Sequence, residues 1–379
     1  MRETFHLVRA EALGERDWQS IARLRAACPG ARSPFLDPGF ARAVAQVRPD
    51  THVGLARRDG ALVAAWPLHL ARDGWTRPAG APFADWNGPL IAPGSTLTPA
   101  RMIDALGLTG HTASNMTMRP GGPALHHETT RALITDLSAG APAVLDALTR
   151  RRPRHFKKLR RLARKLEADT GPLTLSRAGP DSGVLDRLFE IKRNQLVRTG
   201  LHDVLSPAWV RALFESLHRP RCDDGFGAQL FVLEAGGEFV AAEFNLRSGP
   251  IMHGWLAGYD KRFSAYSPGH LLMLHLLPEI ARQGILEYDA GTAEHSYKDY
   301  FANGERTGHA ATLFAESRRT AFRPVHNTLH RLEHAGPGRI SRLIGRARRR
   351  LDQICAAETS LGGRTRGTLL ALRRLLPAG

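Results

Sequence analysis

Two acidic residues in the last third of the sequence have the surroundings that acid–base catalysis requires. Glu243 lies between alanine and phenylalanine in an apolar run, so burial would tune its proton affinity. Asp289 ends the apolar run ILEYD, and the small residues AGTA that follow leave room for a substrate at a strand end. Either carboxylate could remove the proton from an acceptor amine or hydroxyl. Glu243 could equally pair with Arg247 or His253.

A second set of functional side chains follows Asp289 directly. The segment YKDYF supplies Tyr297 and Lys298, and we expect it to lie on a short helix near residues 294–302. A purely structural interpretation is also open, in which Lys298 pairs with Asp299 or Asp289 and the aromatic rings pack. His270 and His295 are weaker candidates in the same region.

The start of the helix expected at Ser267-Pro268-Gly269 has the pattern of an anion site. Ser267 can cap the helix and Pro268 suits its first position. The backbone amides of Gly269, His270 and Leu271 would then point out of the helix start, where the helix dipole adds positive charge. Lys261 and Arg262 precede it, so a pyrophosphate could be met from both sides. An ordinary capped helix is the alternative.

Substrate contacts are predicted in two places. The Pro- and Gly-rich stretch RPAGAPFADWNGPLIAPGS reads as a long ordered loop, and Asp85, Trp86 and Asn87 stand at its centre. Trp255 and Tyr259, in the strand PIMHGWLAGY, are the other candidates.

The order of elements that must position these residues is regular. In the first 150 residues, SPFLDPGFARAVAQV predicts a helix capped by Ser33, and THVGLARRDGALVAAWPLHL predicts two strands joined by a DG turn. From residue 171 the pattern predicts a strand, two helices, three antiparallel strands, the helix at Pro268, the strand ILEYD, a short helix and a final strand. The fold class is therefore α/β (α+β), with a mixed central sheet flanked by helices.

Composition restricts the class of protein. The chain has 379 residues, and this length suits two domains with an extension. Its hydrophobic content of 42% is typical of globular proteins. The net charge is +17. There is no run of eighteen apolar residues and no signal-peptide pattern at the start, so we expect a cytoplasmic protein. Three widely spaced cysteines and the lack of HExxH or CxxC spacing predict no metal site. With no GxSxG motif, direct transfer is favoured over a covalent enzyme intermediate.

The positive charge is concentrated in two segments. Ten basic residues and no acid lie between 150 and 165, and PRHFKKLRRLARKLEA (153–168) predicts an amphipathic helix with a basic face. Residues 318–379 contain 14 arginines and 3 acids, on two predicted amphipathic helices. The first segment is either a solvated surface or a surface for phosphates. The second either packs on the body or binds an anionic membrane surface or a cyclic dinucleotide, and in the membrane case the protein would be peripheral at the inner face.

Three sequence segments resemble the BioF2-like and CelD-like branch of the GNAT acetyltransferases, relatives of the FemAB aminoacyltransferases: GWLAGYDKRFSAYSPGHLLM, ILEYDAG and YKDYF. The resemblance covers about residues 30–317. It implies tandem GNAT-like domains: an N-terminal one at 1–150, a basic linker helix at 151–169, a C-terminal acyltransferase domain at 170–317 and an Arg-rich extension at 318–379. The family's longer Gly-rich loop is reduced here to Gly269.

The resemblance also implies an activity. Lys298 resembles the lysine that FemAB-type transferases place beside the transferred acyl group, where an ammonium stabilises negative charge, and Tyr297 could protonate a leaving thiolate. We expect an acyl-CoA-dependent N- or O-acyltransferase, with acetyl-CoA as the donor, acting on a sugar, exopolysaccharide or cell-envelope precursor. Aminoacyl-tRNA is the alternative donor. A non-enzymatic effector that responds to a nucleotide through the Arg-rich tail is the third hypothesis.

Overall fold

The computed structural model of the chain describes residues 2–122, 124–218, 225–292, 297–316, 328 and 338–373. It has the mixed α/β class that the sequence predicts, with one 13-stranded mixed sheet and helices on both faces. His295 lies outside the described residues, as do 318–327, 329–337 and 374–379 of the predicted extension.

The first half of the chain contributes seven strands and three helices before the connecting helices. In chain order they are β1 (Glu3–Arg9), α1 (Glu15–Ala27), α2 (Pro38–Val47), β2 (Thr51–Arg58), β3 (Ala61–Leu70), β4 (Trp75–Pro78), β5 (Leu90–Ile91), α3 (Pro99–Ala105), β6 (Gly110–Met116) and β7 (Ala124–Asp136). Two connecting helices follow, α4 (Ala141–Arg151) and α5 (Pro153–Thr170).

The second half repeats a similar order. Its elements are β8 (Leu173–Ala178), α6 (Val184–Arg198), α7 (Ala208–Leu217), β9 (Phe226–Ala235), β10 (Glu238–Ser248), β11 (Ile251–Tyr259), the 3-10 helix η4 (Lys261–Tyr266), α8 (Pro268–Arg282), β12 (Glu287–Thr292), the 3-10 helix η5 (Tyr297–Tyr300) and β13 (Gly304–Phe314). The extension forms α10 (Gly338–Ala357) and α11 (Leu361–Arg373). The 3-10 turns Ala10–Ala12, Pro34–Leu36 and Pro180–Ser182 complete the described elements.

Local sequence accounts for most of these boundaries. The β2–β3 turn has positive φ at both Asp59 and Gly60, the geometry that a two-residue Asp-Gly hairpin favours. The predicted cap of α2 is wrong: Ser33 accepts a hydrogen bond from Phe35 N in the preceding 3-10 turn, whereas Asp37 accepts from Gly39 N and caps α2. Pro38 fits the first position only when Asp37 is the cap.

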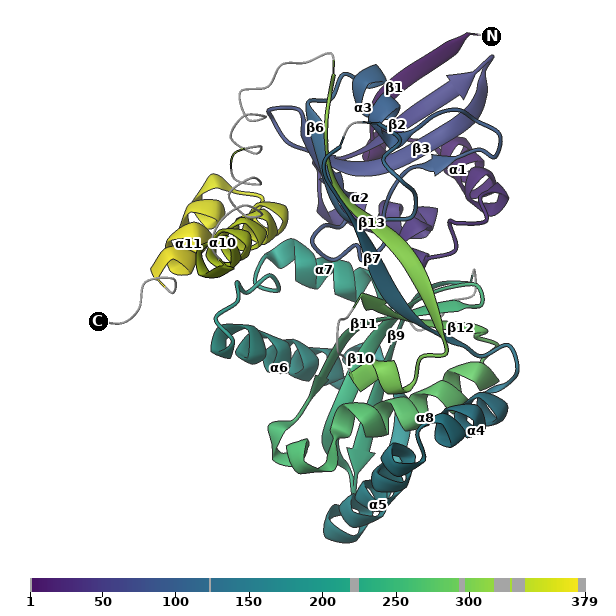
Figure 1. Ribbon diagram of the computed structural model, residues 1–379, viewed down its shortest axis with the longest axis vertical. Helices are drawn as coiled ribbons and strands as arrows, with labels where there is room; N and C mark the ends of the chain where they lie inside the picture. The colour runs from purple at the N-terminus through teal and green to yellow at the C-terminus, as the bar shows by residue number, and fades with distance from the viewer. Residues whose placement is uncertain are drawn as a thin grey trace.

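The two halves share strands at their junction. The strand order is β1-β2-β3-β4-β6-β13-β7-β12-β11-β10-β9-β8, so β13 returns to lie between β6 and β7 of the first half. Figure 1 shows β7 and β13 running side by side from one half into the other. Strands from before and after residue 150 therefore belong to one sheet, and the division into domains at that residue stays a prediction.

Packing around the second half buries both faces of its sheet. Leu188 of α6 and Phe214 of α7 pack on one face against Phe244 of β10. Leu271 of α8 and Leu166 of α5 cover the opposite face. Neighbouring residues of β10 therefore point to opposite helical layers.

Candidate active site

A gap opens in the sheet between β11 and β12. These two parallel strands pair only at Ile251 with Glu287, Met252 with Tyr288 and His253 with Asp289. Beyond this point the register of β11 against β10 shifts, so that the paired residues skip Trp255. Neighbouring parallel strands that separate in this way leave a crevice at their carboxyl ends, where α/β proteins bind ligands.

On the α8 face of this gap, Glu243 and Lys298 form a buried ion pair. Lys298 Nζ lies 2.9 Å from Glu243 Oε1 and 3.4 Å from the carbonyl oxygen of Gly254. The Tyr288 hydroxyl donates to Glu243 Oε2 at 2.8 Å. Glu243 is fully buried. The structure therefore brings together two predicted residues. Glu243 pairs with Lys298 and not with Arg247 or His253, and Lys298 pairs with Glu243 and not with Asp299 or Asp289.

The charges of the pair control the nearby titrations. Burial alone would lower the pKa of Lys298, but the Glu243 carboxylate outweighs it and holds that pKa well above its usual range. Burial, together with Glu243, raises the pKa of Tyr288 well above 10. Burial raises the pKa of Tyr297 to about 12. At neutral pH Lys298 is thus an ammonium, and Tyr288 and Tyr297 keep their protons.

On the other face of the gap, Asp289 belongs to a chain of charged groups. His253 lies between two carboxylates, with Nδ1 3.5 Å from Asp289 Oδ1 and Nε2 2.8 Å from Asp85 Oδ2. Asp289 Oδ2 accepts from Trp86 Nε1 at 2.7 Å and from Arg306 Nη1 at 3.1 Å. The predicted Asp85 and Asp289 therefore meet through His253.

Burial and charge act in opposite directions on this chain. Burial would lower the pKa of His253, but Asp289 and Asp85 raise it to about 9. Burial would raise the pKa of Asp289, but His253, the Gly291 amide and Arg306 lower it. Asp289 is fully buried, contrary to the open position that its small neighbours suggested, whereas the Asp85 side chain is 37% exposed. Of the three charged groups Asp85, His253 and Asp289, a substrate can therefore reach Asp85.

The start of α8 differs from its prediction. The amides of His270 and Leu271 both donate to Ser267 O, at 3.0 and 3.1 Å, so two of the three amides expected to bind a phosphate are already used. Ser267 is the N-cap residue, but its side chain makes no capping hydrogen bond. A Cβ added to Gly269 would lie 3.2 Å from the ring of Tyr297. That ring therefore covers part of the helix start.

Cations near this helix start come from α5. His155 stacks on Tyr300 with ring centres 3.7 Å apart and lies 4.9 Å from the ring of His270. Burial lowers the pKa of His270 to about 4, and the charge of Lys158 contributes to that shift. Lys165, seven residues later on the same side of α5, has its Nζ 5.8 Å from the centre of the Tyr266 ring. The basic helix predicted at 153–168 thus flanks the start of α8.

Two of the other predicted residues border a pocket, and one is engaged elsewhere. Tyr259 and Lys261 line a pocket of about 250 Å³ between α6 and the end of β11. Arg262 forms ion pairs with Glu238 at 2.9 Å and Asp260 at 3.2 Å. Their roles in cofactor or substrate binding stay predictions.

The remaining substrate candidates are mostly buried. Trp255 donates to the Phe83 carbonyl at 2.9 Å and stacks on Phe214, and Trp86 is 1% exposed. Asn87 is buried, and within the described part of the chain neither of its side-chain polar atoms has a hydrogen-bond partner. The rings of Trp255 and Trp86 therefore support the site through packing and hydrogen bonds, and their burial leaves them little surface for a substrate.

Sequence reasoning missed Lys192 and gave His253 only as a partner for Glu243. The Lys192 stem lies over Gly258, and burial together with the charge of Lys298 lowers its pKa. A lysine on a predicted amphipathic helix carries no signal of its own, because only the packing of α6 on β11 brings it near Lys298. Within the described residues, no cluster of histidine, cysteine or acidic side chains could hold a metal ion.

Comparison with known proteins identifies the fold. Residues 153–299 match the model of the acetyltransferase (GNAT) domain family. The crystal structure of FemX is similar with a TM-score of 0.55 and 12% identity, over 86% of this chain and 99% of that one. A tandem GNAT protein from the clavulanic acid biosynthesis pathway is similar with a TM-score of 0.50 and 14% identity, over 84% and 100%. No curated protein matches the sequence closely enough for comparison.

Proposed function

We propose that this chain, an acyltransferase with a GNAT-type acetyltransferase domain at residues 153–299, transfers an acyl group from acyl-CoA directly to an amine or hydroxyl of a sugar or cell-envelope precursor. The observation that carries the proposal is the convergence of Lys298 and Glu243 on Gly254, where β11 and β12 separate. An acyl carbonyl held in this gap would develop negative charge beside an ammonium.

The other groups of the site have compatible roles. Tyr297 keeps its proton at neutral pH because its pKa is raised to about 12, so its hydroxyl can donate a hydrogen bond to a leaving thiolate. Asp85 is the exposed end of the chain through His253 to Asp289, and we assign it the removal of the acceptor's proton. His253 and Asp289 then act by holding Asp85 in place.

The donor's phosphates are assigned to the space between α5 and the start of α8. Lys158 and Lys165 supply positive charge there. This charge takes the role expected of the His270 and Leu271 amides, which already donate to the Ser267 carbonyl oxygen. Because acyl-CoA is a cytoplasmic metabolite, the proposal retains the expected location. In the described part of the chain, no helix has the length and apolar character to cross a membrane.

The test is the release of free thiol from a panel of acyl-CoAs in the presence of amino-sugar and hydroxyl acceptors. Thiol release should require both substrates, and Lys158→Gln should raise the KM for acyl-CoA. Arg161→Gln, an exposed neighbour on α5, is the matched control and should leave KM unchanged. Absence of acceptor-dependent thiol release with every donor would reject acyl-CoA as the co-substrate.

Aminoacyl-tRNA is a second candidate donor because α5 presents several exposed cations outward, among them Lys157, Arg161 and Arg164. RNA held by such a face should bind with a steep dependence on salt concentration. Exchanging these three side chains for glutamine should then abolish transfer from aminoacyl-tRNA, whereas an acyl-CoA enzyme should tolerate the change.

A further inference from the structure

The C-terminal helices are attached to the body by specific contacts. Ile354 and Ala357 of α10 are fully buried. Trp209 Nε1 donates to the Ala357 carbonyl at 2.8 Å, and Arg48 Nη1 donates to the Ala356 carbonyl at 3.3 Å. The end of α10 therefore has a defined position against α7 and the first half of the chain, and Figure 1 shows α10 and α11 well away from α8.

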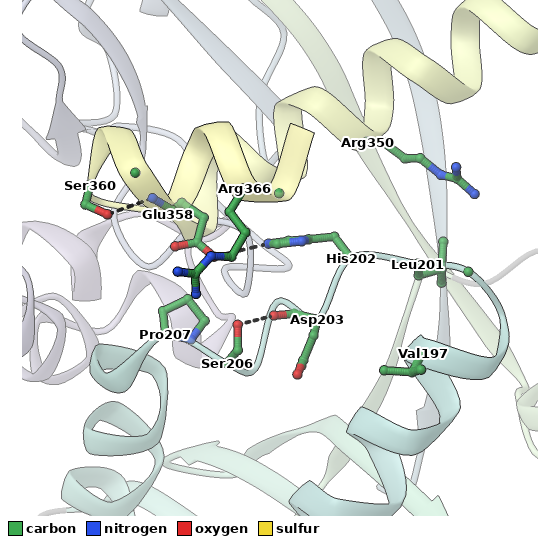
Figure 2. Close-up of a pocket in the computed structure, with 14 residues that line it drawn as sticks. Val197, Leu201, His202, Asp203, Ser206, Pro207, Arg350, Glu358, Ser360 and Arg366 are labelled. Atoms are coloured by element: carbon green, nitrogen blue, oxygen red, sulfur yellow. Dashed lines mark hydrogen bonds and ion pairs between the residues drawn. The ribbon is translucent and has the colours of Figure 1, made fainter. Parts of the chain in front are cut away.

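A pocket of about 640 Å³ lies between these helices and the connection from α6 to α7. Figure 2 shows the two sides of this pocket, with Val197, Leu201 and Pro207 on the body and Arg366 on α11. Val197 is 53% exposed and Leu201 is 40% exposed. The volume is within the range of small-molecule sites, which are commonly 300–1,000 Å³.

The extension gives the pocket donors for an anion. Arg350 and Arg366 both line it, and the Nη1 atom of Arg350 is buried with no hydrogen-bond partner among the described residues. Gly362 and Gly363, in the first turn of α11, also line it, but the Gly363 amide already donates to Ser360 Oγ at 3.0 Å, so the two arginines are the donors offered to an anion. A buried guanidinium nitrogen without a partner is unfavourable, and a phosphate oxygen would satisfy it.

The body and the link between α10 and α11 each supply an acceptor. Asp203 Oδ1 is buried without a hydrogen-bond partner among the described residues, while its Oδ2 accepts from Arg193 at 2.8 Å. Glu358 Oε1 lies 3.3 Å from His202 Nε2. A simple anion would be repelled by these carboxylates, whereas a ligand that also carries hydroxyl groups could donate to them.

We infer that this pocket binds a nucleoside phosphate, a function separate from the acyl-transfer site. The phosphates contact Arg350 and Arg366. A ribose hydroxyl donates to Asp203, and the base lies against Val197 and Leu201. The base would cover the exposed apolar surface of Val197 and Leu201, and the ribose and the phosphates would satisfy Asp203 Oδ1 and Arg350 Nη1.

Titration calorimetry on the full chain with ADP and GDP tests the assignment, with adenosine, guanosine and pyrophosphate as the separated parts of the two ligands. At least one of the two nucleotides should bind at least tenfold more tightly than either of its parts. Arg366→Gln and Arg350→Gln should each weaken nucleotide binding at least tenfold, and Asp203→Asn should weaken it without affecting pyrophosphate. Arg349→Gln, one residue along α10 and outside the pocket lining, is the matched control.

Three results would overturn the inference. They are no binding of either nucleotide, equal binding to wild type and Arg366→Gln, or equal affinity for pyrophosphate and nucleotide. Thermal unfolding of each variant identifies any that fails to fold. Because coenzyme A itself contains an adenosine phosphate, the KM for acyl-CoA is measured as well, and Arg366→Gln should leave it unchanged. An increased KM would instead assign the pocket to the donor.

Discussion

The Glu243–Lys298 pair offers a test in which stability and chemistry can be separated. Lys298→Ala would leave the fully buried Glu243 carboxylate with the Tyr288 hydroxyl as its remaining side-chain donor. Removing one member of a buried pair costs about 3–5 kcal/mol of folding free energy. That loss is a large part of the 5–15 kcal/mol by which domains are typically stable, so loss of activity in this variant alone proves little.

The informative variant changes both residues, Lys298→Gln with Glu243→Gln. Two amides can bond to each other and to Tyr288, and no unpaired charge stays buried. We expect its free energy of unfolding to exceed that of Lys298→Ala by at least about 2 kcal/mol. The ammonium is nonetheless gone, and loss of one donor to a developing oxyanion lowers kcat by about 10²–10³.

Urea unfolding followed by tryptophan fluorescence gives the stabilities, and thiol release at saturating substrate gives kcat. A folded double variant with the wild-type kcat would show that the pair is structural and that Lys298 takes no part in transfer. Equal stability of the single and double variants would contradict the reasoning about buried charge.

Other measurements address the opposite face and the backbone. The pKa of His253 is about 9 in the folded protein and 6.5 in the unfolded chain, so protonated His253 stabilises the fold by about 3 kcal/mol below pH 6.5, and this stabilisation is lost as the pH rises through 9. His253→Gln should flatten this decline in the free energy of unfolding, measured in urea at a series of pH values. An unchanged profile would contradict the positive charge assigned to His253. Gly254→Ala should abolish activity, because the added Cβ would lie 2.0 Å from the Tyr288 hydroxyl, whereas Gly179→Ala, with open space around it, should be silent in the same assay. Trp209→Phe should weaken the attachment of α10 by about 1 kcal/mol, seen as faster proteolysis within residues 338–373, and unaltered protection would argue against that hydrogen bond.

Local patterns predicted most elements and the residue types of the site. Periodicity identified α5, α8 and the three-strand meander because each is amphipathic or apolar over several turns or residues. Glu243 and Lys298 were both named, but their pairing depends on η5 packing across β11, a relation between residues 55 positions apart that no local pattern encodes.

Errors arose where a distant segment decides the environment. Asp289 was expected to face open space, yet Trp86, 203 residues away, and Arg306 of β13 enclose it. The α8 start failed for a local reason: Leu271 is the fourth helical residue, and an amide at that position already bonds to the cap residue.

The charged groups Asp85, His253 and Asp289 and the C-terminal helices each make contacts with both halves of the chain. Asp85 comes from the first half and reaches His253 of the second, so the reach of the exposed carboxylate depends on how the halves are held together. The extension contacts both, through Arg77 with Asp352 at 2.9 Å on one side and Trp209 with Ala357 on the other. A ligand between α11 and the α6–α7 connection would hold the extension against the second half. If the extension helps to hold the halves together, Asp352→Ala should lower the rate of acyl transfer although Asp352 supplies no group to it, and an unchanged rate would show that the extension only packs on the body.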